Sequence, residues 1–544
     1  MSSLKVVGLL ADIHQRRIYP AEIAIDRGSI TAITELQSVP DGSPYILPGF
    51  VDAHVHIESS MLVPSEFARM AVVHGTVATV SDPHEIANVC GIEGVEYMIS
   101  NGKTVPFKFY FGAPSCVPAT SFETAGAAVD AEQVSALLKR PEVKYLSEMM
   151  NFPGVIHNDE EVMKKIAHAQ EMKKPVDGHA PALRGKDLEK YIDAGISTDH
   201  ECFTREEAEE KLSLGMKIII REGSAARNFD ALIDLLHNYP DRMMFCSDDK
   251  HPDSLEIGHI DRLCARAAER NIDLFKILDA ACKNPVIHYG LEVGLLREGD
   301  PADLILVENL QEFRVFRTYI NGELVAEKGD SMIRSSAPGI INNFDCDKKN
   351  VSDFGCPAVS EKYLLPVIEA LDGQLITNKL NQQPKLEDGN WVSDVKKDVL
   401  KMAVVNRYRP SPAAIAFIKN FGLKDGALAS SVAHDSHNIV AIGTDDESLC
   451  KAVNMVIAHK GGISLVKENT EMVVPLPVAG LMSTDDGYHV ARQYSLIDQA
   501  AKEAGCTLAS PYMTLSFMAL LVIPHLKLSD RGLFDGDDFR LIQV

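Results

Sequence analysis

The sequence predicts an α/β protein built on a (β/α)8 barrel of the TIM type, joined to a discontinuous small β domain and a C-terminal α/β domain. Between residues 48 and 290, β-rich runs alternate with helical stretches, and about eight such runs can be counted. This span is close to the ~250 residues that are typical of such a barrel. The chain has 544 residues, more than one hydrophobic core accommodates, so further domains are expected.

Two stretches near the N-terminus alternate apolar and polar residues with a period of two, as strands do. They are Ala21–Ile25 and Ser29–Ile33, and alone they are too little to bury a core. The β pattern returns after the barrel, at 299–307. We therefore expect residues 1–47 and 291–345 to form one small β domain.

The predicted barrel comprises residues 48–290. Helices are expected between its strands; for example, Thr204–Leu214 begins with a capping box, Thr-Arg-Glu-Glu. The predicted strands are Gly49–His56, Thr76–Ser81, Lys108–Gly112, Val143–Glu148, Pro175–His179, Ile196–His200, Met216–Arg221 and Met243–Asp248.

Residues 346–544 are predicted to form the C-terminal α/β domain, which could lie over the barrel mouth. The pattern favours helices at Ala413–Phe421 and Asp446–His459. It favours strands at Ala427–Val432, Ile439–Ile442 and Ile463–Val466.

Composition narrows the class of protein. Lys and Arg number 54 against 77 Asp and Glu, and the net charge of -23 argues against nucleic acid or an anionic membrane as the main partner. The ten cysteines are scattered without a Cys-x-x-Cys pair, which indicates reduced thiols. The N-terminus lacks the features of a signal peptide, and no apolar run approaches ~20 residues. We expect a soluble, cytoplasmic protein.

Polar side chains gather where the predicted strands end, which is where such barrels carry their active sites. His54 and His56 lie two residues apart on a buried strand, so they share a face and can bind one divalent metal ion. The alternative for this pair alone is two hydrogen-bonded core histidines. Seven of the eight counted strand ends carry a histidine or a carboxylate, which packing does not readily explain.

Four histidines and two carboxylates form the predicted metal-binding set, which suits Zn, Mn or Fe. Six ligands exceed what one catalytic metal takes while leaving room for water, so two divalent ions are expected, and the ligand set accepts Zn, Mn and Fe alike. A hydroxide bridging two ions is a nucleophile at neutral pH, and Asp248 is placed to take its proton. His54, His56 and Asp248 would hold the first ion, His179 and His200 the second, and Glu148 would bridge them.

Other polar residues near the strand ends have two interpretations. Asp82, His84 and Glu85 surround Pro83, so they could contact substrate or only cap the next helix. Arg221 and Glu222 could contact substrate or form an ion pair at the rim. His434 and His437 could be a polar turn, or they could bring the C-terminal domain into the active site.

Several contiguous motifs resemble the amidohydrolase superfamily and, within it, the barrel-built bacterial adenine deaminases. The superfamily pattern is the His-x-His strand, single histidines on later strands and a final aspartate. The closer motifs are 54–61 (His-Val-His-Ile-Glu-Ser-Ser-Met), 81–88 (Ser-Asp-Pro-His-Glu-Ile-Ala-Asn), 148–151 (Glu-Met-Met-Asn), 177–181 (Asp-Gly-His-Ala-Pro), 198–201 (Thr-Asp-His-Glu), 246–249 (Cys-Ser-Asp-Asp) and 432–438 (Val-Ala-His-Asp-Ser-His-Asn).

The resemblance implies hydrolysis of adenine to hypoxanthine and ammonia, in which hydroxide attacks C6 and Asp248 shuttles the proton. It also implies adenine as the small-molecule partner, manganese as the favoured metal of the active form with iron or zinc as alternatives, and a homo-oligomer. The acid that protonates N1 stays open among Glu201, Glu222, His84 and Glu85. The predicted catalytic residues are Asp248, Glu148, Glu201 and His84, and the predicted substrate-binding residues are Glu58, Ser59, Asp82, Glu85, Arg221, Glu222, His434 and His437.

Two alternatives remain. One is a related amidohydrolase that acts on another amino-purine or on a cyclic amide. Hydantoinase-like relatives bridge their metals with a carboxylated lysine at the end of strand four, where this chain has Glu148, and Lys144 lies four residues back. The other is a non-catalytic barrel scaffold, against which the complete ligand set argues.

Overall fold

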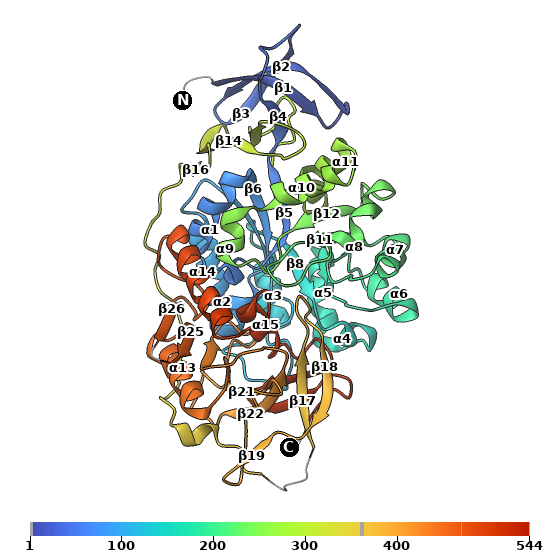
Figure 1. Ribbon diagram of the computed structural model, residues 1–544. Coiled ribbons are helices and arrows are strands. Elements are labelled where there is room, and N and C mark those ends of the chain that lie inside the picture. The colour runs from blue at the N-terminus through green and yellow to red at the C-terminus, as the bar shows by residue number, and fades with distance from the viewer. Residues whose placement is uncertain (1–3, 359–363, 469, 543–544) are drawn as a thin grey trace.

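Three bodies follow one another along the molecule (Figure 1). The computed structural model describes residues 4–358, 364–468 and 470–542. A β sheet lies at the N-terminal end, a barrel of parallel strands in the middle, and a β-rich body at the far end. The predicted domains extend over residues 1–3, 359–363, 469 and 543–544, which lie outside the described part of the chain, and their boundaries stay predictions.

The central body is a closed barrel of eight parallel strands, so the predicted fold class is confirmed. Its strands form a five-stranded sheet and a three-stranded sheet, each in sequence order. Parallel bridges between Val176 and Ile196 and between Val55 and Asp248 join the two sheets. The strands are β5 (Phe50–Val55), β6 (Thr76–Ser81), β7 (Lys108–Ala113), β8 (Val143–Met149), β9 (Val176–Gly178), β10 (Thr198–Asp199), β11 (Lys217–Arg221) and β12 (Met243–Cys246).

Helices cover the outside of the barrel (Figure 1). Side chains cap several of them as the sequence indicates: Thr204 accepts from the Glu207 amide, and Asp130 and Gln133 form a capping box. The helices are α1 (Pro64–Ala71), α2 (His84–Gly102), α3 (Ala131–Leu138), α4 (Phe152–Ile156), α5 (Glu160–Glu171), α6 (Gly185–Asp193), α7 (Arg205–Ser213), α8 (Phe229–Leu232), α9 (Pro252–Ile257), α10 (Ile260–Glu269), α11 (Leu274–Leu278) and α12 (Asn284–Tyr289).

The N-terminal sheet draws its strands from both sides of the barrel segment in the sequence. Its order is β16-β15-β14-β13-β4-β1-β2-β3, and β13 runs antiparallel to β4 with Leu304 opposite Pro48. The strands are β1 (Leu4–Asp12), β2 (Arg17–Asp26), β3 (Ser29–Glu35), β4 (Tyr45–Pro48), β13 (Leu304–Val307), β14 (Val315–Ile320), β15 (Glu323–Glu327) and β16 (Asp330–Ser331).

The C-terminal body is built on an eight-stranded sheet, order β18-β17-β22-β21-β24-β23-β25-β26, flanked by helices α13 (Asp446–Ala458), α14 (Gly487–Glu503) and α15 (Pro511–Phe517). Its strands, with those of the smaller sheets, are β17 (Leu365–Ala370), β18 (Thr377–Gln382), β19 (Lys385–Glu387), β20 (Asn390–Val392), β21 (Val399–Val405), β22 (Ala414–Lys419), β23 (Ala427–Ser430), β24 (Ile439–Gly443), β25 (Gly462–Lys467), β26 (Thr470–Pro475), β27 (Leu526–Ser529), β28 (Gly532–Asp535) and β29 (Arg540–Leu541).

One secondary-structure prediction in this body was wrong. The segment Ala413–Phe421 was expected to be helical, but it contains strand β22. Strand β22 hydrogen-bonds to β21 on one side and to β17 on the other, so pairing across the sheet overrides its helical propensity. The helix at Asp446–Ala458 and strands β23, β24 and β25 agree with the predictions.

One large apolar core extends through the barrel into the C-terminal body, and smaller separate clusters pack in the N-terminal sheet and within the C-terminal body. Across the described ranges, no helix is both long and apolar enough to cross a membrane.

Asp52 closes the barrel between its first and last strands. Its fully buried carboxylate accepts from the Ser247 amide (2.9 Å) and hydroxyl (2.5 Å), and it lies 2.8 Å from Nε2 of His259. We predict that Asp52→Ala destabilises the protein by about 3 kcal/mol or more, because several buried donors lose their acceptor. Thermal unfolding tests this against Asp41→Ala in an exposed turn. An Asp52→Ala variant that unfolds at the same temperature as Asp41→Ala would contradict the role of Asp52 in closing the barrel.

Candidate metal centre

The barrel strands bring the predicted ligands to one end of the barrel, each at most 5% exposed. His54 lies near the end of β5 and His56 directly after it. Asp248 follows β12. Its amide donates to the His54 carbonyl (3.0 Å), and its carbonyl accepts from the His56 amide (3.4 Å). Backbone pairing across the barrel seam therefore holds these three side chains together.

The first ligand group converges on one point. The Nε2 atoms of His54 and His56 lie 3.1 Å apart, and Oδ1 of Asp248 lies 3.5 Å and 3.4 Å from them. Donor atoms about 2.1 Å from one metal ion stand roughly 3.0–3.4 Å apart. The spacing of these atoms is therefore that of ligands around a single ion.

The two carboxylate oxygens of Glu148, in strand β8, face different histidines. Oε1 lies 3.3 Å from Nε2 of His56. Oε2 lies 2.8 Å from Nδ1 of His179 and 3.2 Å from Nε2 of His200. One carboxylate thus joins the first ligand group to a second group of two imidazoles.

The residues present fit a divalent metal site. Buried groups of histidine and carboxylate atoms lie within 4.8 Å of one another, among them His54, His56 and Asp248, and separately His54, Glu148 and His200. Two imidazole nitrogens facing each other without a hydrogen atom between them repel, and a cation among them relieves this. The donor set, nitrogen with carboxylate oxygen, suits first-row divalent metals.

Arg221 and Glu201 form a buried ion pair beside the second group. The Arg221 guanidinium donates to both Glu201 oxygens and, at 2.9 Å, to Oδ2 of Asp248. Burial alone would raise the pKa of Glu201, but the Arg221 guanidinium together with His179 and His200 outweighs burial, and the pKa falls to about 2. Glu201 is therefore held as an ionised carboxylate, and Arg221 fixes its position and that of Asp248.

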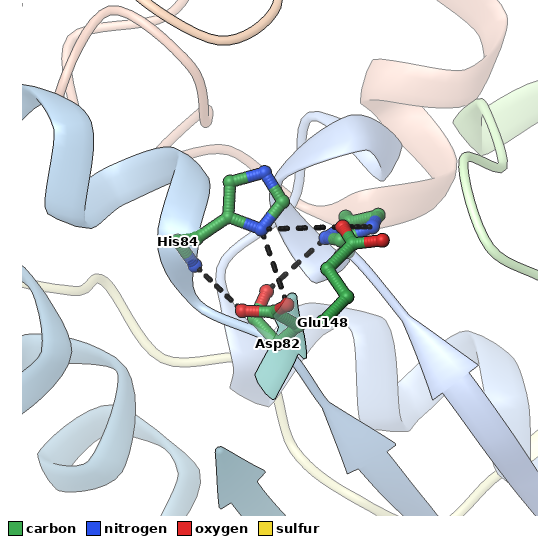
Figure 2. A group of neighbouring side chains, drawn as sticks. Asp82, His84 and Glu148 are labelled. Atoms are coloured by element: carbon green, nitrogen blue, oxygen red, sulfur yellow. Dashed lines mark hydrogen bonds and ion pairs between the residues drawn. The ribbon is translucent and has the colours of Figure 1, made fainter. Parts of the chain in front are cut away.

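His84 lies between two pairs of carboxylates, and Figure 2 shows the pair beside Nδ1, Asp82 and Glu148. Its Nδ1 atom is 3.2 Å from Oδ2 of Asp82 and 3.5 Å from Oε1 of Glu148. Its Nε2 atom is 3.4 Å from Oε1 of Glu85 and 3.6 Å from Oδ1 of Asp435. Burial opposes protonation of His84, but these carboxylates outweigh it and raise its pKa well above the usual value.

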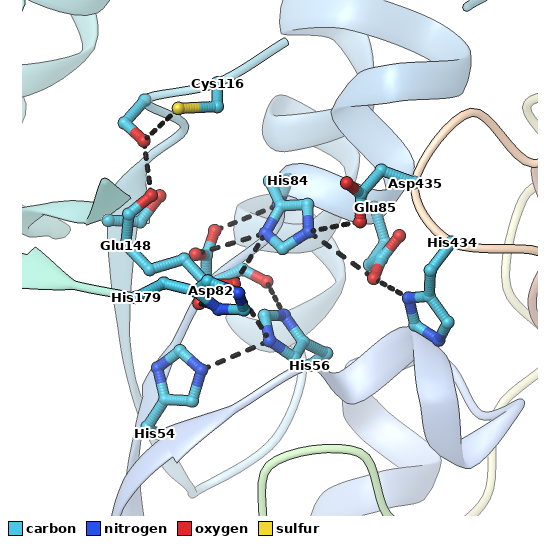
Figure 3. Close-up of polar contacts among 12 residues, drawn as sticks. His54, His56, Asp82, His84, Glu85, Cys116, Glu148, His179, His434 and Asp435 are labelled. Atoms are coloured by element: carbon cyan, nitrogen blue, oxygen red, sulfur yellow. Dashed lines mark hydrogen bonds and ion pairs between the residues drawn. The ribbon is translucent and has the colours of Figure 1, made fainter. Parts of the chain in front are cut away.

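The C-terminal body reaches the site through Glu85 (Figure 3). One oxygen of Glu85 pairs with Nδ1 of His434 and the other with Nε2 of His437. His434 lies in a polar turn between strands β23 and β24, and this turn brings His434 and His437 to the barrel mouth, while their part in substrate binding stays a prediction. His434 and Asp435 line the same cavity as the metal-ligand candidates.

The remaining predicted residues differ in their distance from the cavity that the ligand candidates line. Ser59 donates to Asp249 (2.5 Å), which lines the cavity. Glu58 is buried, and its carboxylate accepts from the Ile86 amide (3.1 Å). Burial raises the pKa of Glu58 to about 7. Glu222 is not brought into the cluster, because its carboxylate pairs with Arg266 (2.7 Å) outside the barrel.

Sequence reasoning did not select several residues that line the cavity. Two of them, Asp249 and Asp435, are acidic and directly follow the candidates Asp248 and His434 in the sequence. This position is a signal from which they could have been predicted. The apolar residues gave none, since nothing local distinguishes them from core. These are Met150 from the barrel and Leu375, Phe517 and Leu520 from the C-terminal body.

The chain belongs to the amidohydrolase family, whose pattern it matches over residues 45–325. Residues 374–540 match a second family, described as the adenine deaminase C-terminal domain. Together the two matches cover the barrel and most of the C-terminal body.

Full-length relatives carry the name adenine deaminase. One from Salinibacter ruber is 56% identical over 543 residues, covering 99% of each chain. One from Methanosarcina mazei is 52% identical over 551 residues, again with 99% of each chain covered. A solved structure of an adenosine deaminase from Xanthomonas campestris with bound zinc aligns with 61% of this chain and 94% of its own, at 14% identity and a TM-score of 0.46.

The position of Glu148 between the two ligand groups leads to a prediction about metal content. Glu148→Gln removes the charge that joins the two ligand groups, so we expect the metal content after manganese loading and desalting to fall from about two ions per chain towards one. Elemental analysis measures this. Glu132→Gln, on the exposed face of α3, is the matched control. Unchanged stoichiometry in Glu148→Gln would refute bridging.

Proposed function

We propose that this protein hydrolyses adenine to hypoxanthine and ammonia at a binuclear metal centre at the barrel mouth. The observation that carries the proposal is identity above 50% to relatives named adenine deaminase over 99% of the chain. The complete set of buried ligand candidates supports it, since it supplies the chemistry that hydrolysis needs.

The proposed ligands are His54, His56 and Asp248 for one ion, His179 and His200 for the other, and Glu148 between them. Bound divalent ions supply Lewis acidity and make water a nucleophile near neutral pH. The convergence of both Glu148 oxygens on different imidazoles supports two ions rather than one.

Asp248 is the proposed carrier of the proton. Water adds to C6 of adenine and N1 gains a proton from an enzyme acid. The C6–N bond then breaks and ammonia leaves, and the remaining hydroxyl proton is released as the carbonyl forms, which restores the acid that protonated N1. Asp248 takes a proton from the attacking water and passes it to the departing amine. Arg221 donates to Oδ2 of Asp248, which holds the carboxylate in its ionised, proton-accepting form before the reaction.

His84 is the proposed acid for N1. Glu201 is held ionised by Arg221, Glu222 lies outside the cluster, and Glu85 is bound by two imidazoles, so none of these three is favoured as a proton donor. His84 lines the cavity, and the four carboxylates around it stabilise its protonated form. It is therefore the group best placed to give a proton to the ring.

The proposed substrate-binding residues are Glu58, Ser59, Asp82, Glu85, His434 and His437. Ser59 acts through Asp249 and His437 through Glu85, so both position groups that line the cavity. A scaffold without activity is disfavoured because every ligand position is filled. Manganese as the active metal, a homo-oligomer and a cytoplasmic location remain predictions.

The proposed reaction is tested by ammonia release. We expect the manganese-loaded protein to release one ammonia per adenine, with hypoxanthine formed in equal amount, and to act much more weakly on guanine and hydantoin. Chelation followed by desalting should abolish turnover, and manganese should restore it. No ammonia from adenine would overturn the proposal, and preferential turnover of hydantoin would favour a cyclic amidase.

Asp248→Asn tests the proton path. We expect kcat for adenine to fall about 10²–10⁴-fold, the usual effect of losing a general acid–base group, while the thermal unfolding midpoint changes little. Asp241→Asn on the exposed surface is the control. An Asp248→Asn variant that keeps full activity would remove this carboxylate from the mechanism.

A further inference from the structure

The residue that follows His179 is fixed through both of its backbone groups. The amide of Ala180 donates to Oδ1 of Asp199 (2.9 Å), and the Ala180 carbonyl accepts from Nζ of Lys211 (2.7 Å). Asp199 directly precedes His200 in the chain. One buried carboxylate therefore links the backbone beside His179 to the backbone beside His200, and these are the two imidazoles of the second ligand group.

Lys211 is the centre of this network. It belongs to α7, in the outer layer of helices (Figure 1), yet its side chain is 0% exposed. Besides the Ala180 carbonyl, its ammonium donates to Oδ2 of Asp199 (2.8 Å) and to Oε1 of Glu207 (2.7 Å). An ammonium has three donors, so all of them are engaged. Glu207 also accepts from the Ala182 amide (2.9 Å), and the loop after β9 is thus held at two points.

Tyr191 of α6 ties the same histidine to strand β8. Its side chain is fully buried, and its hydroxyl accepts from the His179 amide (3.1 Å) and donates to the Met149 carbonyl (2.8 Å). Met149 directly follows Glu148, whose Oε2 lies 2.8 Å from Nδ1 of His179. The hydroxyl therefore fixes the spacing between the shared carboxylate and the nearest imidazole of the second group.

The first ligand group has a different support. Backbone pairing between the first and last barrel strands holds its three residues, and the carboxylate of Asp52 accepts from the Ser247 amide beside them. The hydrogen bonds of Lys211 and Tyr191 described above go to residues between Met149 and Glu207, a part of the chain that contains none of the first three ligands. The two halves of the metal centre are thus supported by separate sets of contacts.

We propose that Lys211 and Tyr191 are positioning residues for the second metal ion, and that they set how tightly this ion binds while the first ion binds independently of them. The inference rests on the two-ion centre of the proposed function. Side chains that orient metal ligands from behind typically change metal affinity about 10–100-fold when they are replaced. Because both residues act through the backbone beside His179, their effect is expected in metal binding.

Lys211→Met keeps most of the side-chain length and removes the ammonium. In the full-length protein we expect the Kd of the second manganese ion to rise at least about tenfold and the Kd of the first to change less than about threefold. Competition with a chelating dye measures both constants, and elemental analysis after desalting should show a fall from about two ions per chain towards one.

Lys401→Met is the matched control for this variant. Lys401 is also buried, at 1% exposed, and its ammonium donates to the Phe354 carbonyl (2.9 Å) and to Asp446 (2.5 Å) within the C-terminal body. The control should lower the thermal unfolding midpoint, because it leaves a carboxylate without its partner, and should leave both manganese constants unchanged.

Tyr191→Phe is the milder variant, because it removes one hydroxyl and no charge. It keeps the inference testable if Lys211→Met fails to fold. We expect the Kd of the second manganese ion to rise about tenfold. The matched control is Tyr512→Phe in α15, which loses the bond from its buried hydroxyl to the Ser464 carbonyl (3.0 Å) and should leave both constants unchanged.

His200→Ala identifies which ion is affected. This variant lacks a ligand of the second group and should retain one ion. Adding Tyr191→Phe or Lys211→Met to it should leave the Kd of the remaining ion unchanged. If either added substitution weakens that ion about tenfold, the two residues support the whole centre and the proposed selectivity for the second ion is overturned.

The outcomes separate this inference from the proposed reaction. If the folded variants have lower unfolding midpoints but both manganese constants of the wild type, the residues are purely structural and the inference is overturned, while deamination of adenine stands. If the variants lose one ion selectively but the wild type releases no ammonia from adenine, the reaction falls and the positioning role stands. A wild type that binds a single manganese ion overturns the inference whatever the reaction.

Discussion

One shared carboxylate organises the centre of this protein. Glu148 faces His56 with one oxygen and His179 and His200 with the other, at distances of 2.8–3.3 Å. It lies near the carboxyl end of β8, and the imidazoles come from strands on either side of β8. The geometry holds only if the barrel is closed, since the first ligand group depends on backbone pairing between Asp248 and His54. Fold and chemistry are therefore linked through the same few atoms.

Much of this centre could be predicted from the sequence because its determinants are local. Alternation along a strand places His54 and His56 on one face, and parallel strands bring their carboxyl ends together. The same rule explains Arg221 and Glu222, neighbours that point to opposite sides of the barrel wall. The helix predicted at Ala413–Phe421 failed because hydrogen bonds to two neighbouring strands decide its conformation, and those partners are not visible in the segment itself.

The apolar residues that line the site could not be predicted, for a physical reason. Leu375, Phe517 and Leu520 are ordinary apolar residues whose role depends on packing between bodies that are distant in sequence. Glu85 illustrates the intermediate case. Its place after β6 marked it as a candidate, but only the fold reveals that it is neutralised by two histidines about 350 residues further along the chain. Polar groups at strand ends carry a sequence signal, while contacts between bodies do not.

The N-terminal sheet has a consequence for the whole barrel. Strands β4 and β13 are hydrogen-bonded neighbours, with Pro48 opposite Leu304, so the polypeptide leaves the sheet and returns to it at the same place after 49–303. In polymer terms the catalytic segment is a large closed ring whose ends are clasped by backbone hydrogen bonds. Because the entropic cost of closing such a ring grows only slowly with its length, insertions in the barrel loops can be accommodated without loosening the clasp. A substitution that disrupts the pairing of β4 with β13, by contrast, releases both ends of the barrel segment at once.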